Sequence, residues 1–499
     1  MIAIAGTERP SATALQIAGL CVAGLVGVLV PLSSGAQLPQ ALLVVAGFVT
    51  LVVLLVTRVI TAVDLLVIGS PFMFIIPAGH LNMAAADLIL PLAVLQTLVA
   101  YRHADPSNRL QPRHVAYLVA LVMAVTVSSI GGLLVERDYL AEEAVIGGMK
   151  LVVGVGYLLA VLFELRTKGL PALLRLLRLW SWVAVGLAAA SIITAIGLAP
   201  LVPYDGERSN GFFTDPNLFG AYLIVSLVLV LTRNSIVYHP TWLLQAVVIA
   251  GGVITTGSRG SMMTLVAVLV AGFLFMRRLT IRLSILSIGA ALFIFISTAL
   301  SNPTGTAAAM GTSRLISAAE KVESDGRILL WQKALELWSE SPLTGVGLGQ
   351  FAVHTANMPG YYRPNAGPDT GYVAHNTFLS LGVETGVLGL GLVLFGLVWV
   401  ARRLYSSPPV FRDARTALIL GIMALSLEMM TLNLQNLRYV WMFFGVAIAF
   451  PHIAAAAQAS EEGPDGQEAG LSVDRRAGAS RVPRHPGRRP RDPALHRRS

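Results

Sequence analysis

The chain consists mainly of apolar runs that are about as long as a membrane is thick. Of its 499 residues, 55% are hydrophobic and only 13% are charged, and the mean hydropathy is +0.71. Soluble domains usually carry about 25% charged residues. A membrane-spanning helix needs roughly 20 apolar residues, and backbone groups in lipid must pair within their own segment. The sequence therefore predicts an all-α, polytopic integral membrane protein.

The apolar runs predict about 12–14 transmembrane helices. The candidate spans lie near 12–31, 37–57, 60–78, 84–101, 114–135, 143–164, 177–199, 215–232, 240–257, 260–276, 282–300, 385–401, 414–433 and 438–457. The runs at 60–78 and 260–276 are the weakest, because each is short or interrupted. The first run is too long for a signal peptide and is predicted to be an uncleaved anchor. It holds the single cysteine, Cys21, so no disulfide can form within the chain.

The placement of lysine and arginine predicts the orientation in the membrane. With both termini in the cytoplasm, the arginine-rich loops fall on the cytoplasmic side, and a large loop at 301–374 falls on the extracytoplasmic side. Residues 1–457 then form one membrane domain. The tail at 458–499 is rich in Pro, Gly, Arg and Ala, so we expect it to be disordered. Contact between this tail and anionic lipid is a second interpretation, and nucleic-acid binding is not expected.

The large loop contains one clear amphipathic helix, predicted over 326–341. Its apolar positions are Ile328, Trp331, Leu335 and Trp338, and Pro342 ends the helix. Asp325 is a suitable N-cap residue. This helix is predicted either to lie on the bilayer surface or to pack on other loops. A second helix is predicted to begin at Asn376, another residue type that favours the N-cap.

Four arginines fall on the predicted extracytoplasmic side, where the positive-inside rule makes arginine rare: Arg208, Arg259, Arg314 and Arg327. Arg259 lies in a tight turn between two spans, at the mouth of the helix bundle, where an ionisable residue is a functional candidate. Arg327 lies in the first turn of its helix, where the helix dipole disfavours a cation, which indicates an anionic partner. Guanidinium groups bind phosphate oxygens in pairs, so these arginines suit a diphosphate leaving group. The alternatives are an interfacial role for Arg259 and an ion pair with Asp325 or Glu323 for Arg327.

His375 and three glycines complete the polar segment. An imidazole accepts a proton from a hydroxyl near neutral pH, so His375 is a candidate base, with an ordinary interfacial histidine as the alternative. Gly345, Gly347 and Gly349 either let the backbone approach a ligand closely or form a plain turn. The chain shows no P-loop lysine, no metal-ligand spacing and no nucleophile elbow. An ATP site, a metal site and a serine hydrolase are therefore not indicated.

The motifs in the C-terminal half resemble the O-antigen ligase and O-antigen polymerase superfamily over roughly 200–455. The matching positions are Asp215-Pro216-Asn217, Ser258-Arg259-Gly260, Arg327 with Trp331, Pro342 to Gly347, His375-Asn376 and Glu384 to Gly389. Together these motifs are specific, whereas each one alone is not. The predicted spans outnumber those of the ligases and the basic tail is not a family hallmark, so the choice between ligase and polymerase stays open.

The resemblance implies a GT-C-like helical fold in the inner (plasma) membrane of a bacterium, with the active site on the extracytoplasmic face. It implies glycan transfer from a polyprenyl-diphosphate carrier, such as undecaprenyl diphosphate, to an acceptor hydroxyl on a glycan, lipid or protein, without a metal or other cofactor. By resemblance, the catalytic residues are His375, Arg327 and Arg259. The residues implied in substrate binding are Arg208, Asp215, Asn217, Arg314, Asn376 and Glu384. Other membrane proteins of glycan assembly are implied as partners.

Two other classes of function remain alternatives to an inverting glycosyltransferase. A transporter or flippase for lipid-linked sugars or small anions would carry polar groups at mid-membrane and broken helices. A non-catalytic assembly partner would not need Arg259, Arg327 and His375 together. The apolar spans and the clustering of polar groups on one face favour the enzyme.

Overall fold

The computed structural model describes residues 60–73, 75–78, 81–110, 112–135, 140–204, 208–301, 327–356, 358 and 372–461. The predicted spans near 12–31 and 37–57, Arg314 and most of the basic tail lie outside these residues. The chain divides into two units, Met1–Ala454 and Ala455–Ser499. The helices and strands below belong to the first unit, and of the second unit only the last residues of one helix are described.

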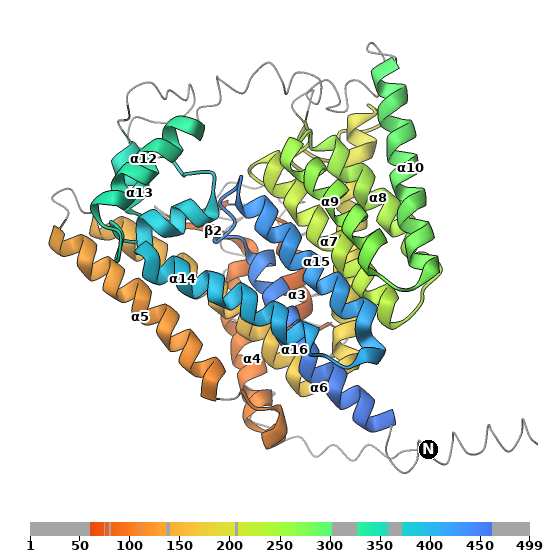
Figure 1. The fold of residues 1–499 in the computed structure, drawn as a ribbon, viewed down its shortest axis with the longest axis horizontal. Coiled ribbons are helices and arrows are strands. Elements are labelled where there is room, and N and C mark those ends of the chain that lie inside the picture. The colour runs from red at the N-terminus through yellow and green to blue at the C-terminus, as the bar shows by residue number, and fades with distance from the viewer. Residues whose placement is uncertain are drawn as a thin grey trace, which may run out of the picture. The chain divides into compact units, whose positions relative to one another are not determined.

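The described residues are almost entirely helical (Figure 1), which confirms the predicted fold class. The α-helices are α3 (Ala62–Gly69), α4 (Leu90–Arg102), α5 (Pro112–Val135), α6 (Ala141–Ala195), α7 (Pro216–Ile236), α8 (Trp242–Thr255), α9 (Arg259–Phe275), α10 (Leu279–Ser301), α12 (Arg327–Glu340), α13 (Gln350–Thr355), α14 (Thr377–Tyr405), α15 (Arg412–Met429) and α16 (Arg438–Glu461). Short 3-10 turns occur at η1 (Ala85–Leu88), η2 (Pro106–Asn108) and η5 (Pro409–Phe411).

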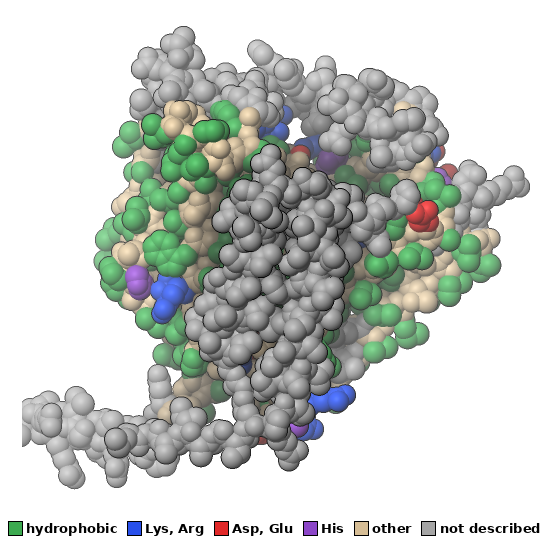
Figure 2. Space-filling model, turned by 180° about the vertical axis from the view of Figure 1, so that it is seen from behind, with side chains coloured by type: hydrophobic (Ala, Val, Ile, Leu, Met, Phe, Trp, Pro, Cys, Tyr) green, Lys and Arg blue, Asp and Glu red, His purple; other side chains and the backbone are tan. Residues whose placement is uncertain are grey.

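Several of these helices have the length and composition of membrane spans. Among the described residues, four helices are long and apolar enough to cross a membrane: Ala141–Ala195, Pro216–Ile236, Thr377–Tyr405 and Arg438–Ser460. Shorter apolar helices lie at Val119–Leu134, Trp242–Thr255, Arg259–Phe275 and Leu279–Ala291. The described surface in Figure 2 carries mostly hydrophobic side chains. The chain is therefore a polytopic membrane protein, and each predicted span between 114 and 457 lies on a described helix.

The predicted span at 60–78 is wrong, because its residues do not form one helix. Helix α3 ends at Gly69, and the strands β1 (Ile75–Ala78) and β2 (Leu81–Ala84) then form a small antiparallel hairpin. Pro71 and Pro77 explain the break, since proline lacks the amide hydrogen that a helix interior requires. The interruption that made this run one of the weakest candidates is thus a true break in the helix.

Helix α7 lies at the centre of the packed helices. Every residue from Phe219 to Ser235 is buried, as expected of a helix that is apolar on all sides. The ring of Tyr222 packs against Trp180 of α6, with the centroids 6.2 Å apart, and against Tyr439 of α16 at 5.4 Å. Helix α7 thus gives the neighbouring helices a common core.

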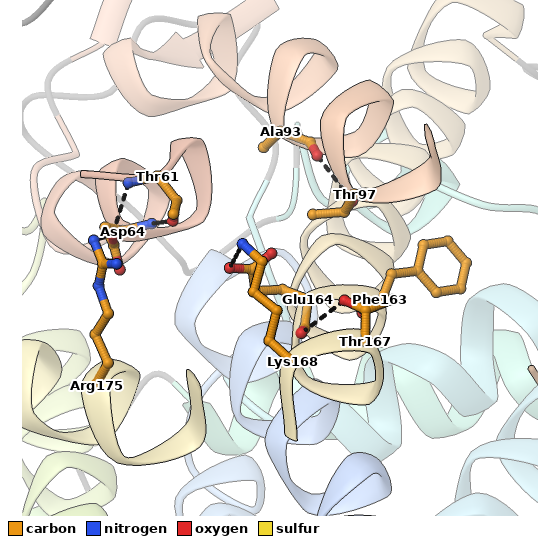
Figure 3. Close-up of polar contacts among 9 residues, drawn as sticks. All are labelled: Thr61, Asp64, Ala93, Thr97, Phe163, Glu164, Thr167, Lys168 and Arg175. Atoms are coloured by element: carbon orange, nitrogen blue, oxygen red, sulfur yellow. Dashed lines mark hydrogen bonds and ion pairs between the residues drawn. The ribbon is translucent and has the colours of Figure 1, made fainter. Parts of the chain in front are cut away.

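The long helix α6 is two helices joined at a kink. Gly169 has φ 65° and ψ −147°, and Pro171 follows it. Ion pairs flank the kink: Lys168 binds Glu164 at 2.7 Å, and Arg175 reaches across to Asp64 of α3 (Figure 3). The kink therefore accounts for the two separate spans predicted over this stretch.

A buried ion pair ties the start of α16 to η1. The Nε of Arg438 donates to Oδ1 of Asp87 at 2.6 Å, and a second guanidinium nitrogen donates to Oδ2. The Tyr157 hydroxyl donates to the same carboxylate at 3.1 Å, and the Ala84 amide donates to Oδ2 at 2.9 Å. The carboxylate of Asp87 is thus fully hydrogen-bonded, which is the condition under which a buried charge pair is tolerated.

Replacing Asp87 with alanine is expected to destabilise the fold by about 3–5 kcal/mol, because Arg438 is left buried without its counter-charge. The control is Glu336→Ala, which removes a surface pair with Lys333 that is worth about 0–1 kcal/mol. Thermal unfolding of the detergent-solubilised protein, followed by tryptophan fluorescence, measures both. Equal midpoints for the two variants would contradict the structural role of the buried pair.

Candidate functional site

The first part of the site is the turn between α8 and α9, which we call the arginine turn (residues 256–260). The chain reverses at Gly257, with φ 58°, and the Ser258 hydroxyl accepts the Ser261 amide as the N-cap of α9. Arg259 is the first residue of α9 and its side chain is exposed. Gly260, predicted to be part of the turn, lies within the helix instead. The arginine turn therefore presents a guanidinium beside a helix N-terminus, an arrangement that attracts anions.

Arg208 packs against the arginine turn. Its Nε donates to the Thr256 carbonyl at 2.9 Å, and a terminal nitrogen donates to Oδ1 of Asn217 at 2.8 Å. Asp215 is the N-cap of α7 and accepts the Asn217 amide at 2.7 Å. Three predicted site residues are thus linked to one another and, through Arg208, to the arginine turn. Arg208 uses hydrogen bonds to hold two helix ends together.

The second part of the site is the turn before α14, which we call the histidine turn (residues 374–377). His375 has φ 48°, the only positive φ of a non-glycine residue in the described part of the chain. Both neighbours of His375 are fixed: the Ala374 carbonyl accepts Nε1 of Trp331 at 2.9 Å, and the Asn376 amide donates to Oδ1 of Asn433 at 2.9 Å. Strained backbone of this kind persists where the surroundings hold it, and it is concentrated at functional sites.

Asn376 begins α14 as predicted. Its side chain accepts the Leu379 amide at 3.0 Å as the N-cap of the helix. The side chain is therefore engaged with the helix end, while the backbone of Asn376 holds the histidine turn.

Helix α12 brings Arg327 to the histidine turn. Arg327 starts the helix, one turn before Trp331, so the two side chains leave from the same side of α12. Trp331 contacts Ala374, the residue before His375. Helices α12 and α13 lie beside the first part of α14 (Figure 1). Arg327 thus lies one helical turn from the tryptophan that contacts the residue before His375.

The face with which α12 packs differs from the predicted one. The buried residues are Leu330, Ala334 and Leu337, whereas Ile328 and Leu335 are 42% and 55% exposed. One apolar stripe therefore packs on the protein, which agrees with one of the two interpretations, and the other stripe is exposed; contact with the bilayer surface stays a prediction. The helix bounds agree with the prediction, although Asp325 lies outside the described residues.

The loop at 430–437, between α15 and α16, connects the two turns. A Cβ added at Gly260 would lie 3.2 Å from Oγ1 of Thr431. The Thr377 hydroxyl donates to the Leu432 carbonyl at 2.7 Å, and Asn433 holds the Asn376 amide. Consecutive residues of one loop therefore contact the arginine turn and the histidine turn. Sequence reasoning missed this loop, although its polar residues between two apolar runs were a usable signal.

The glycine-rich turn at 342–349 packs on α14, so its glycines do not form a ligand cradle. Helix α14 is broken at Gly386, with φ 63° and ψ −167°. The Val346 amide donates to the Val383 carbonyl at 2.9 Å, and the Val387 amide donates to the Pro342 carbonyl at 2.9 Å. A Cβ at Gly345 would lie 2.6 Å from the Val383 carbonyl oxygen. The glycines serve close backbone packing, which agrees with the plain-turn alternative.

Glu384 caps the short helix that follows this turn. Its side chain accepts the amides of Gly349 and Phe351 at the start of α13, with Lys150 and Glu143 nearby. The carboxylate thus has a structural task, and its predicted contact with substrate stays a prediction. Arg314 lies outside the described residues. Within the described ranges, no three His, Cys, Asp or Glu side chains gather closely enough to hold a metal ion.

An apolar cavity of about 190 Å³ runs beside the histidine turn, between α5, α6, α14 and α16. Its polar lining includes Thr377, Gln435 and Asn436, which belong to the histidine turn and the loop at 430–437. Most other lining residues are apolar, among them Leu381, Val393 and Phe444. The cavity therefore suits a hydrocarbon chain whose polar end lies at the site.

Replacing Gly386 with alanine is expected to destabilise the fold. Its backbone conformation costs about 1–3 kcal/mol for other residues, and the new Cβ would lie 2.2 Å from the Leu343 carbonyl oxygen. Gly391→Ala is the matched control on the same helix, because no described atom lies within 4 Å of its added Cβ. Unfolding midpoints in detergent compare the two. A midpoint for Gly386→Ala at or above that of Gly391→Ala would refute this packing role.

Comparison with known proteins agrees with the motifs. Residues 244–395 match the protein-family model described as "O-Antigen ligase". This range contains Arg259, Arg327, His375 and Glu384. A segment of 106 residues is 34% identical to the "Exopolysaccharide production protein ExoQ" of Rhizobium meliloti (strain 1021), and it covers 20% of this chain and 24% of that protein. The match thus spans about a quarter of the relative's length.

Proposed function

The chain carries a domain of the O-antigen ligase family at residues 244–395, and on that premise we propose that it is a membrane glycosyltransferase of surface polysaccharide biosynthesis. It moves a glycan from a polyprenyl-diphosphate carrier to an acceptor hydroxyl on the extracytoplasmic face. The observation that carries this proposal is the convergence of the arginine turn and the histidine turn on one loop, at 430–437.

The arginines serve the diphosphate. Arg259 lies at the N-terminus of α9, where the helix dipole adds to its positive charge. Arg327 lies at the N-terminus of α12, next to the histidine turn. Guanidinium groups bind phosphate oxygens through charge-assisted hydrogen bonds. They stabilise the negative charge that develops as the bond from the anomeric carbon to the diphosphate oxygen breaks.

His375 serves the acceptor. The acceptor hydroxyl oxygen attacks the anomeric carbon, and the imidazole takes up the hydroxyl proton, while the polyprenyl diphosphate leaves as an anion. A single displacement of this kind inverts the anomeric centre. The fixed backbone of His375, held by Trp331 and Asn433, orients the imidazole before substrate arrives.

The apolar cavity serves the lipid chain of the carrier. Its polar end adjoins Thr377, so a hydrocarbon chain inside it would place an attached diphosphate near the histidine turn. Lipid chains gain most of their affinity from burial of apolar surface.

A transporter explains these features less well. The break in α14 resembles the broken helices of transporters, but the turn at 342–349 satisfies its backbone groups with hydrogen bonds. Among the described residues, no charged side chain lines the apolar cavity, so it does not suit the passage of an anion.

His375→Ala is expected to lower glycan transfer about 10²–10⁴-fold through loss of the general base, and Arg259→Ala about 10²–10³-fold through loss of charge stabilisation. The assay uses the protein in liposomes with a polyprenyl-diphosphate oligosaccharide and measures released polyprenyl diphosphate and the glycan product. Arg102→Ala is the control, because this arginine ends α4 at the predicted cytoplasmic face. The identity of the product separates a ligase, a polymerase and a protein glycosylating enzyme. Full transfer by both site variants would overturn the assignment.

Val393→Trp is expected to raise the KM for a long-chain polyprenyl donor, because the indole fills the apolar cavity. A donor with a short prenyl chain should be affected less. Val398→Trp is the control, since this residue of the same helix is 57% exposed. Initial rates with donors of two chain lengths give the comparison. Equal KM changes for both donors would exclude the cavity as the lipid site.

A further inference from the structure

Beneath the arginine turn, a group of buried polar atoms has no direct hydrogen-bond partner. Glu428 of α15 is 1% exposed, and neither of its carboxyl oxygens is paired within the described part of the chain. The same holds for the hydroxyls of Ser261 on α9 and Tyr222 on α7, which are both fully buried. Buried polar groups of folded proteins are almost always satisfied by protein or by ordered water. Several buried polar atoms without a partner in one place therefore indicate that a further polar molecule binds there.

These groups lie close together. The Ser261 and Thr264 hydroxyls of α9 lie near enough to the Glu428 carboxyl to interact with it, although without the geometry of a full hydrogen bond, and Tyr439 of α16 interacts with it electrostatically. The rings of Tyr439 and Tyr222 lie 5.4 Å apart. Helices α9, α15 and α16 thus bring one buried carboxyl group and several hydroxyl groups together, and Tyr222 of α7 lies beside Tyr439; we call this group the polar pocket.

Charge determines what the pocket holds. The basic side chain nearest in sequence to Tyr439, Arg438, is already bound to Asp87. The described groups that interact with the Glu428 carboxyl, Ser261, Thr264 and Tyr439, are all neutral hydroxyls. An ionised carboxylate without a basic partner is strongly disfavoured in such surroundings. A protonated carboxyl can donate one hydrogen bond and accept others. The pocket therefore suits a neutral carboxyl and a water molecule, which needs two to four polar partners.

Glu428 also lies where the two halves of the site join. Its carbonyl accepts the Thr431 amide at 3.0 Å, at the start of the loop at 430–437. Its side chain faces Ser261, two residues after Arg259. A rigid bridge at this position fixes the arginine turn relative to the loop that holds Asn376. Small displacements of catalytic groups are costly, since about 1 Å can lower a rate a hundredfold.

We propose that Glu428, together with Ser261 and Tyr222, holds a buried water molecule, and that this bridge positions Arg259 and the loop at 430–437. Glu428 is thus a positioning residue that acts through α9 and does not touch the substrate. Its effect on transfer depends on the proposed function, whereas the protonated carboxyl and the bound water do not.

Infrared difference spectroscopy of the protein in liposomes tests the protonated carboxyl. On exchange into deuterated water, the wild type is expected to show a protonated-carboxyl band that Glu428→Gln lacks. A high-resolution cryo-EM map is expected to show a water density between Glu428 and Ser261. A wild type without the band, or a pocket without this density, would overturn the proposal.

Transfer kinetics test the positioning role. Glu428→Gln keeps a donor and an acceptor and should retain transfer within about threefold, whereas Glu428→Leu should lower kcat about tenfold to a hundredfold with a smaller change in KM. Tyr222→Phe removes only one hydroxyl and should lower kcat to a lesser degree, which covers the case that Glu428→Leu does not fold. Gln245→Leu is the control. Gln245 is equally buried and unpaired among the described residues. It lies ten residues before the end of α8, which places it about 15 Å along the helix from the arginine turn.

The kinetic outcomes are separable from those of the proposed function. If Glu428→Gln is as impaired as Glu428→Leu, or if a folded Glu428→Leu keeps wild-type kcat, the bridge is refuted. If the wild type transfers no glycan while the carboxyl band and the water density are present, the proposed function fails and the pocket stands.

Discussion

The arrangement of the site depends on how the loop at 430–437 is held at its two ends. At one end, Arg438 is bound to Asp87 by a buried, doubly hydrogen-bonded ion pair. At the other, Glu428 lies in the last turn of α15 with its carboxyl group close to Ser261 of α9. A loop that is anchored at both ends keeps its residues in fixed positions. Its successive residues then fix Gly260 of the arginine turn and Thr377 of the histidine turn in relation to each other.

The glycines of the motif at 342–349 have a structural role. Gly345 and Gly386 allow the turn at 342–349 to pack on the broken helix α14, with carbonyl oxygens close to where side chains would begin. This packing fixes the first part of α14, whose N-terminus carries His375 and Asn376. The glycine-rich motif therefore belongs to the scaffold, and the charged and titratable groups lie at the helix ends that it supports.

Hydropathy predicted the helices because a span in lipid is specified locally, by the apolar residues of the run itself. It failed at 60–78, where Pro71 and Pro77 interrupt the run. A common site for Arg259, Arg327 and His375 was expected only from the family resemblance, and it stays a prediction. Asp87 and Glu428 were missed, since each is one polar residue in an apolar stretch, and Asn433 was missed because it fell inside the predicted span at 414–433. Their partners are distant in sequence: the Asp87–Arg438 bond joins residues 351 positions apart.

The central claim is that the arginine turn and the histidine turn border one donor site. A cryo-EM structure of the protein in a lipid nanodisc with bound polyprenyl diphosphate tests it most directly. The account predicts diphosphate density in contact with Arg259 and Arg327, the prenyl chain in the cavity beside α14, and His375 facing the phosphates. Diphosphate bound away from both arginines, or a cavity left without the prenyl chain, would contradict it.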